Sequence, residues 1–202
     1  MVFILCQAAW NKDNIRECQE LVELDEKLPA ILKGTTKPQD AQEALALADL
    51  CYRKSLYVAA ARLFGQAFES RTGLADSLQA DQRHPAASAA ALAGCGKGKD
   101  DPPDGAARAR WREKAREWLR AELAAWEKLL MSDSPQTRDQ LKKTLAHWKE
   151  ERDLVGLREE AELAKLPDAE RRACQVLWTD VDMLLKKANA SAPAVMPHSG
   201  HK

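Results

Sequence analysis

Residues that favour β-strands are scarce in this sequence. Among 202 residues there are three Phe and two Tyr, while Ala, Leu, Glu, Lys and Arg dominate the composition. Strands are enriched in β-branched and aromatic side chains, whereas the abundant residues here are strong helix formers. The composition therefore argues against a mainly β protein. It predicts an all-α chain, long enough for one sizeable core or a short helical array.

An excess of charge of one sign is also missing. Lys and Arg together number 31, and so do Asp and Glu, which leaves a formal net charge of zero. Binding to nucleic acid or to a membrane surface relies on a field of one sign, so we expect neither. The apolar run at residues 2–5 is short and has no basic flank, so we expect neither a signal peptide nor a membrane span there. We therefore expect a cytoplasmic protein.

Cysteine pairs at metal-binding or redox spacing are absent as well. The five cysteines are Cys6, Cys18, Cys51, Cys95 and Cys174. Their number is odd and no two of them form a Cys-x-x-Cys pair, which argues against a disulfide framework and against a metal site. We expect reduced thiols, several of them buried as small apolar residues.

Two helical segments folded against each other are predicted from Ala44 to Thr72. Small and aromatic residues recur along them at helical spacing, at Ala44, Ala48, Cys51, Ala60, Phe64 and Ala67. The last three match the second helix of the tetratricopeptide pattern, whereas the first three replace the Trp, Gly and Tyr of its first helix. This stretch therefore predicts one repeat of paired antiparallel helices.

Amphipathic segments on both sides of this repeat predict further helices. They span residues 13–28, 74–94, 106–131, 134–149 and 168–188, and Pro85 predicts a helix boundary near Arg83 and His84. We expect a short tetratricopeptide-like array of about six to eight helices, folded as a single domain over residues 1–188. Its repeat core would be residues 39–131 and its helical extension residues 134–188. Residues 189–202 show no periodicity and are predicted to be disordered.

The segment from Gly94 to Gly105 is rich in glycine and proline, which predicts a loop. Its Gly-x-Gly-x-Gly-Lys spacing is similar to that of a phosphate-binding loop. That loop requires a preceding strand and a Ser or Thr directly after the Lys. Here no strand is predicted, and Asp100 follows Lys99 in place of the Ser or Thr. We interpret the segment as a solvated connection between helices.

The helix predicted over residues 106–131 has a stripe of large apolar side chains. The stripe contains Trp111, Ala115, Trp118, Leu119, Glu122, Trp126 and Leu129, and rings of this size are expected to be buried. Glu122 lies in the middle of the stripe, where its carboxylate could accept from a Trp N–H or pair with an Arg. The alternative is a functional acid in a small hydrolase, working with His84 or His147. We prefer the first interpretation, because no pairing of base and nucleophile accompanies Glu122.

The same helix also carries many basic side chains. They are Arg108, Arg110, Arg112, Lys114, Arg116 and Arg120, and acidic residues are interleaved with them. At helical angles these charges spread around the outer face of the helix. We therefore expect a solvated surface here and not a nucleic-acid site.

Three segments together resemble one known family. They are residues 28–34, which lead into the repeat; residues 89–94 and 115–123, on either side of the Gly-rich loop; and residues 145–148, 153–158, 163–167 and 177–178. Over residues 20–188 the chain is similar to the tetratricopeptide-like helical region found C-terminal to the catalytic domain of planctomycete-type bacterial serine/threonine protein kinases. The sequence has no Gly-rich nucleotide loop, no Val-Ala-Ile-Lys strand, no His-Arg-Asp loop and no Asp-Phe-Gly of the kinase itself.

The resemblance implies an accessory region that holds partners or substrates. We expect a non-catalytic interaction module that binds a peptide or helix of a protein partner on a concave helical face, within a kinase signalling assembly. No catalytic, cofactor-binding or metal-binding residue is predicted. Candidate partner-binding positions, on the first helix of each pair, are Asp49, Arg53, Gln82 and His84. The alternatives are a fragment or relative of such a kinase that lacks the catalytic domain, and a purely structural spacer.

Overall fold

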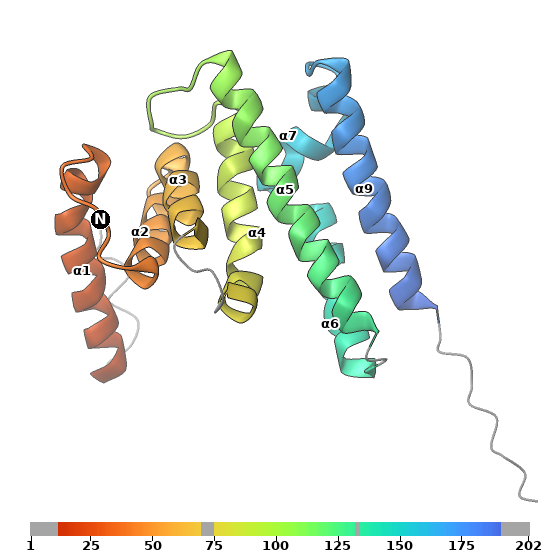
Figure 1. Ribbon diagram of the computed structural model, residues 1–202, viewed down its shortest axis with the longest axis horizontal. Coiled ribbons are helices and arrows are strands. Elements are labelled where there is room, and N and C mark those ends of the chain that lie inside the picture. The colour runs from red at the N-terminus through yellow and green to blue at the C-terminus, as the bar shows by residue number, and fades with distance from the viewer. Residues whose placement is uncertain (1–11, 70–74, 132–133, 191–202) are drawn as a thin grey trace, which may run out of the picture. The chain divides into compact units, whose positions relative to one another are not determined.

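The computed structural model describes residues 12–69, 75–131 and 134–190 (Figure 1). Every element in these ranges is helical, which confirms the prediction of an all-α chain. The elements are α1 (Lys12–Leu32), α2 (Ala41–Arg53), α3 (Tyr57–Glu69), α4 (Ala75–Gly94), α5 (Gly105–Leu130), α6 (Pro135–Glu150), the 3-10 helix η2 (Arg152–Leu154), α7 (Val155–Arg158), α8 (Glu160–Leu163) and α9 (Asp168–Asn189). Nine α-helices in these ranges exceed the predicted six to eight, because residues 152–163 form several short helices. Most of the predicted disordered tail lies outside the described residues.

The chain divides into two compact units, Met1–Ala115 and Arg116–Lys202. The division falls inside α5, so the first unit holds α1 to α4 and the start of α5. The second unit holds the rest of α5 and the elements up to α9. A single domain over residues 1–188, with a repeat core that ends at residue 131, stays a prediction.

Helices α2, α3 and α4 of the first unit lie side by side (Figure 1). Alanine fills many of their buried positions, at Ala41, Ala44, Ala48, Ala59, Ala60, Ala61, Ala67, Ala86, Ala87, Ala89, Ala90, Ala91 and Ala93. Short side chains let the helix axes approach closely, and larger residues such as Leu47 and Phe64 fill the remaining space. Cys51 belongs to this core. Burial raises the pKa of its thiol to about 12, so it packs as a small apolar residue.

The cysteines differ in their bonding. Cys18 is disulfide-bonded, and its partner lies outside the described residues, whereas Cys51, Cys95 and Cys174 form no disulfide. The expectation of reduced thiols is therefore wrong for Cys18 and confirmed for the other three. An odd number of cysteines still allows one pair, and sequence spacing does not reveal which residues the fold brings together.

Helix α4 continues through Pro85, so the helix boundary predicted near Arg83 and His84 is wrong. A proline inside a helix lacks the N–H that would bond to the carbonyl four residues earlier. Directly after Pro85, every side chain of residues 86–91 is buried. This packing offsets the missing hydrogen bond and keeps the helix intact. Pro29 lies inside α1 in the same way.

The loop after α4 is anchored to the start of α3 and is not solvated throughout. The N–H of Lys99 donates to the carbonyl of Ser55 at 2.8 Å, and the N–H of Val58 donates to Asp100 Oδ2 at 2.8 Å. Gly98 allows this approach, since a Cβ there would lie 2.9 Å from the Ser55 oxygen. Burial raises the pKa of Asp100, and its backbone hydrogen bonds counteract the rise. A carboxylate of the chain itself thus sits at a helix start, where a phosphate loop would hold its anion.

The second unit packs α9 against α6 and α7. Its core consists of large side chains, at Leu141, Leu145, Trp148, Leu154, Leu157, Leu163, Leu177 and Val181. Arg158 caps the end of α6, because its Nη1 donates to the carbonyls of Trp148 and Glu151 at 2.9 Å each. The guanidinium also lies 5.7 Å from the ring centre of Trp178. Trp178 in turn donates from Nε1 to the carbonyl of Leu157 at 2.7 Å.

Two basic residues of α5 that the sequence assigns to a solvated face are buried. Arg112 is 8% exposed and Arg116 is 6% exposed. Arg112 Nη1 donates to the carbonyl of Gly94 at 2.7 Å, at the end of α4. Arg116 Nη1 donates to Cys174 Sγ at 3.8 Å. The solvated-face interpretation is therefore wrong at these two positions, because the fold encloses an acceptor for each guanidinium. In the apolar stripe, Trp118 and Glu122 are buried, Trp111 and Trp126 are half-buried, and Leu129 is exposed, so the predicted burial holds for only part of the stripe.

Candidate functional site

The first unit contains a cleft between α2 and α4. Its volume is about 480 Å³, and it is lined by Gln42, Leu45, Ala46, Asp49, Arg53, Gln82 and Pro85. The lining residues of α2 recur at helical spacing and form one stripe along the helix. A separate stripe of α2 is buried in the core. Helix α2 therefore packs one face against the core and lines the cleft with another.

Three of the four predicted partner-binding residues line this cleft. Asp49 and Arg53 come from α2, and Gln82 comes from α4. His84 is not among the lining residues. It lies two positions beyond Gln82, which is a rotation of roughly 200° around the helix, and it is half-buried. The structure thus brings together three predicted residues from two helices and places the fourth on another side of α4.

An ion pair lies on the rim of the cleft. Arg53 Nε and Nη2 are each 2.8 Å from Asp49 Oδ2, and both side chains are about half exposed. A solvated pair one helical turn apart contributes on the order of 0.5 kcal/mol to stability. The two charges cancel, so the cleft has no net charge. Because the pair is weak, an incoming polar group can replace either partner at little cost.

The floor of the cleft is apolar. Leu45 packs against a cluster of buried alanines, and Ala46 and Pro85 line the remaining floor. Gln42 and Gln82 add side-chain amides, which both donate and accept hydrogen bonds. An apolar floor with neutral polar groups around it suits a short protein segment.

The start of α2 is held in place by a capping arrangement. Asp40 Oδ1 accepts from the N–H of Glu43 at 2.9 Å, and Glu43 Oε2 accepts from the N–H of Gln39 at 2.6 Å. Lys27 of α1 donates to Glu43 Oε1 at 2.7 Å, and this hydrogen bond lowers the pKa of Glu43. The bonds fix the start of α2 against α1 and so position the stripe that begins at Gln42.

The residues considered for a hydrolase do not line this cleft. Glu122 is buried in α5, and His147 Nε2 lies 2.9 Å from Glu151 Oε2 on the exposed side of α6. Among the lining residues, Asp49 is the one carboxylic acid, and it is paired with Arg53. The lining residues thus offer one ion pair, two side-chain amides and an apolar surface.

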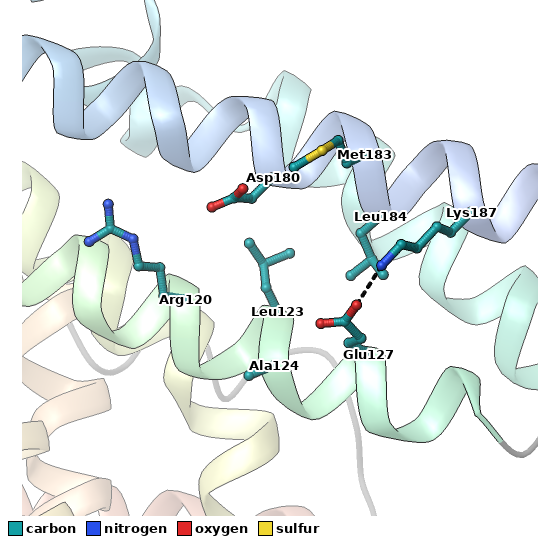
Figure 2. Close-up of a pocket in the computed structure, with 8 residues that line it drawn as sticks. All are labelled: Arg120, Leu123, Ala124, Glu127, Asp180, Met183, Leu184 and Lys187. Atoms are coloured by element: carbon teal, nitrogen blue, oxygen red, sulfur yellow. Dashed lines mark hydrogen bonds and ion pairs between the residues drawn. The ribbon is translucent and has the colours of Figure 1, made fainter.

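A second groove, in the second unit, was missed by the sequence reasoning. It has a volume of about 380 Å³ and is lined by Arg120, Leu123, Ala124 and Glu127 of α5 and by Asp180, Met183, Leu184 and Lys187 of α9 (Figure 2). Lys187 Nζ is 2.6 Å from Glu127 Oε1 across the groove. A signal was present on α9, where Val176, Asp180, Met183 and Lys187 recur at spacings of four and three beside the core stripe.

Comparison with protein-family models, with curated proteins and with solved structures finds no match for this chain. The resemblance to a kinase accessory region therefore stays a prediction from sequence motifs. Across residues 12–69, 75–131 and 134–190, no helix is both long enough and apolar enough to cross a bilayer.

Proposed function

We propose that this protein is a non-catalytic interaction module and that the cleft between α2 and α4 binds a segment of a partner protein. The supporting observation is the convergence of Asp49, Arg53 and Gln82, from two helices, on one cleft with an apolar floor. The same three residues are predicted from sequence by their positions on the first helices of successive pairs. Of the four predicted positions, only His84 lies outside this cleft.

The cleft favours a neutral segment with one apolar side chain. Leu45 and Pro85 would contact that side chain, while Gln42 and Gln82 would bond to peptide groups. The volume lies within the range of roughly 300–1,000 Å³ that is typical of ligand sites, which is room for a few residues. A footprint of this size predicts micromolar affinity, about −8 kcal/mol.

The placement of the helices supports a repeat architecture for this module. Helix α2 begins at Ala41 and α4 at Ala75, 34 residues later, and 34 residues is also the tetratricopeptide period. In stacked repeats the equivalent helices of successive pairs form an extended concave surface. The module would then correspond to the accessory region of a bacterial serine/threonine kinase. It would hold a partner in a kinase signalling assembly, either as a separate chain or as part of a longer kinase.

Peptide display on the purified protein tests this proposal. The affinities of the selected peptides for the wild type and for Ala46→Arg are then measured by titration calorimetry. The longer side chain of Ala46→Arg fills the cleft. The control is Ala106→Arg, the same change at an exposed position of α5. We expect Ala46→Arg to weaken binding at least about tenfold and Ala106→Arg to leave it unchanged. Equal affinities for the three proteins would overturn the assignment of the cleft.

A further inference from the structure

The groove between α5 and α9 carries four charges in an alternating arrangement (Figure 2). Helix α5 supplies Arg120 and then Glu127, whereas α9 supplies Asp180 and then Lys187. On each helix the two charges are seven residues apart, which is about two turns or roughly 10 Å. Glu127 and Lys187 are bonded at 2.6 Å at one end. Arg120 and Asp180 lie toward the other end, so the two charges on each helix, and the two at each end, are of opposite sign.

At that other end the two charges are not neutralised within the described chain. Arg120 Nη2 donates to the carbonyl of Ala173 at 3.1 Å, which is a neutral acceptor. Among the residues that the structure describes, the half-buried carboxylate of Asp180 has no hydrogen bond or ion pair. Both groups are therefore free to pair with charges from outside the chain.

The centre of the groove is apolar. Leu123, Ala124, Met183 and Leu184 line it, and Met183 is 52% exposed. Val176 lies on the same face of α9 as Met183 and is 53% exposed. Flexible methionine side chains at exposed apolar positions are typical of protein-binding surfaces.

We propose that this groove binds the same groove of a second copy of the chain, so that the protein forms a two-fold homodimer. In such a dimer a surface meets its own rotated image and must be complementary to itself. The midpoint between Arg120 and Glu127 falls at Leu123 and Ala124, and the midpoint between Asp180 and Lys187 falls at Met183 and Leu184. All four midpoint residues line the centre of the groove, so one axis across that centre serves both helices.

About this axis each helix lies antiparallel to its own copy. Arg120 faces Glu127 of the second copy, and Asp180 faces Lys187 of the second copy. Since Glu127 and Lys187 are already bonded within one chain, the four charges join into a row of alternating sign that crosses the interface. Ion pairs in a network contribute more than isolated surface pairs. Met183 lies beside the axis and meets its own copy.

Sedimentation equilibrium of the full chain tests the dimer. We expect the wild type to be dimeric above about 10 µM and Arg120→Glu to associate at least about tenfold more weakly. The matched control is Lys143→Glu, the same charge change at an exposed residue of α6, which should leave association unchanged. A wild type that stays monomeric at roughly 1 mM, or equal dissociation constants for the wild type and Arg120→Glu, would overturn the proposal.

Reversal of all four charges separates this pairing from other modes of association. The variant with Arg120→Glu, Glu127→Arg, Asp180→Lys and Lys187→Asp keeps the bond within the chain in reversed form and remains complementary to its own copy. We expect it to dimerise like the wild type but not to form mixed dimers with it, as measured by energy transfer between labelled preparations. Free mixing, or a folded variant that stays monomeric, would contradict the pairing.

A disulfide test does not depend on the charge variants. Met183→Cys places a thiol beside the axis and should give a disulfide-linked dimer on mild oxidation. Met131→Cys, the same change at an exposed residue outside the groove, should give no more linked dimer than the wild type. Absence of a linked dimer for Met183→Cys, or equal linkage for both variants, would refute the proposed axis.

Discussion

The carboxylate of Asp100 caps helix α3 from 42 positions along the chain, where its Oδ2 accepts the N–H of Val58 at 2.8 Å. The bond ties the loop after α4 to the first turn of α3. Because α4 forms one wall of the α2–α4 cleft, the same bond helps to hold that wall in position. Capping by a residue so distant in sequence is a tertiary interaction as much as a local one.

Replacement of this cap should destabilise the fold. Asp100→Ala removes the acceptor and is expected to lower the free energy of unfolding by about 1 kcal/mol, as for other lost N-caps. Asp100→Asn keeps an acceptor oxygen and should cost less. Urea unfolding followed by circular dichroism measures both variants. An alanine variant as stable as the wild type would show that the bond contributes nothing.

The same carboxylate predicts a pH dependence. Burial raises the pKa of Asp100 above 3.8, so the folded state binds this proton more tightly than the unfolded chain does. The resulting stabilisation is full below pH 3.8 and is lost as the pH rises through the folded pKa. Relative to Asp100→Asn, the wild type should therefore lose stability as the pH rises through this window. A difference that grows in the opposite direction would mean that the hydrogen bonds outweigh burial.

Gly94 predicts a steric effect at the junction of α4 and α5. A Cβ at this position would lie 2.5 Å from Arg112 Cγ, 2.9 Å from its backbone nitrogen and 3.1 Å from the carbonyl oxygen of Arg108. Gly94→Ala should therefore lower the free energy of unfolding by about 1–3 kcal/mol despite the better helix propensity of alanine. Gly105→Ala is the control, because its Cβ would meet no atom within 4 Å. Equal effects of the two changes on the urea midpoint would rule out the clash.

Arg158 predicts a stability effect in the second unit. Arg158→Met keeps much of the side-chain volume but leaves the carbonyls of Trp148 and Glu151 without their donor. We expect a loss of about 1.5–3 kcal/mol, which is typical of hydrogen bonds to charged groups. Arg172→Met, at an exposed position of α9, should change the unfolding free energy by less than about 0.5 kcal/mol. If both variants unfolded at the same urea concentration, Arg158 would have no capping role.

Arg53 separates binding from stability. Its pair with Asp49 is solvated, so Arg53→Ala should alter the free energy of unfolding by no more than about 0.5 kcal/mol. The change removes a donor from the rim of the cleft, and selected peptides should bind roughly threefold to tenfold more weakly. Calorimetric titration of Arg53→Ala beside Arg110→Ala, at an exposed position of α5, checks this. Loss of binding only together with loss of stability would speak against a direct contact.

Local periodicity accounts for what could be predicted. In α2 and α3, the alanine and phenylalanine positions at spacings of three and four indicate the buried face directly. Once that face is known, Asp49 and Arg53 must lie on another side of α2. The prediction of Gln82 required only that α4 be the first helix of the next pair.

Interactions between distant segments account for what could not be predicted. The bond between Glu127 and Lys187 joins residues 60 positions apart, so the stripe on α9 alone could not show that α5 forms the other side of the groove. Arg112 and Arg116 look like part of a solvated face, because the charge pattern does not show that the fold encloses the Gly94 carbonyl beside Arg112 and the Cys174 thiol beside Arg116. Helix α4 continues through Pro85 because the side chains that follow the proline are buried. Local helix propensity takes no account of that burial and predicts a helix boundary at the proline.

Methyl NMR spectra recorded during titration with a selected peptide test the interaction module most directly. Leu45 and Ala46 line the α2–α4 cleft, and Leu123 and Ala124 line the α5–α9 groove, so both surfaces carry the same two residue types. We predict that the peptide shifts the methyl signals of Leu45 and Ala46 and leaves those of Leu123 and Ala124 in place. Shifts confined to Leu123 and Ala124, or no shifts at either pair under saturating peptide, would contradict the assignment of the cleft as the binding site.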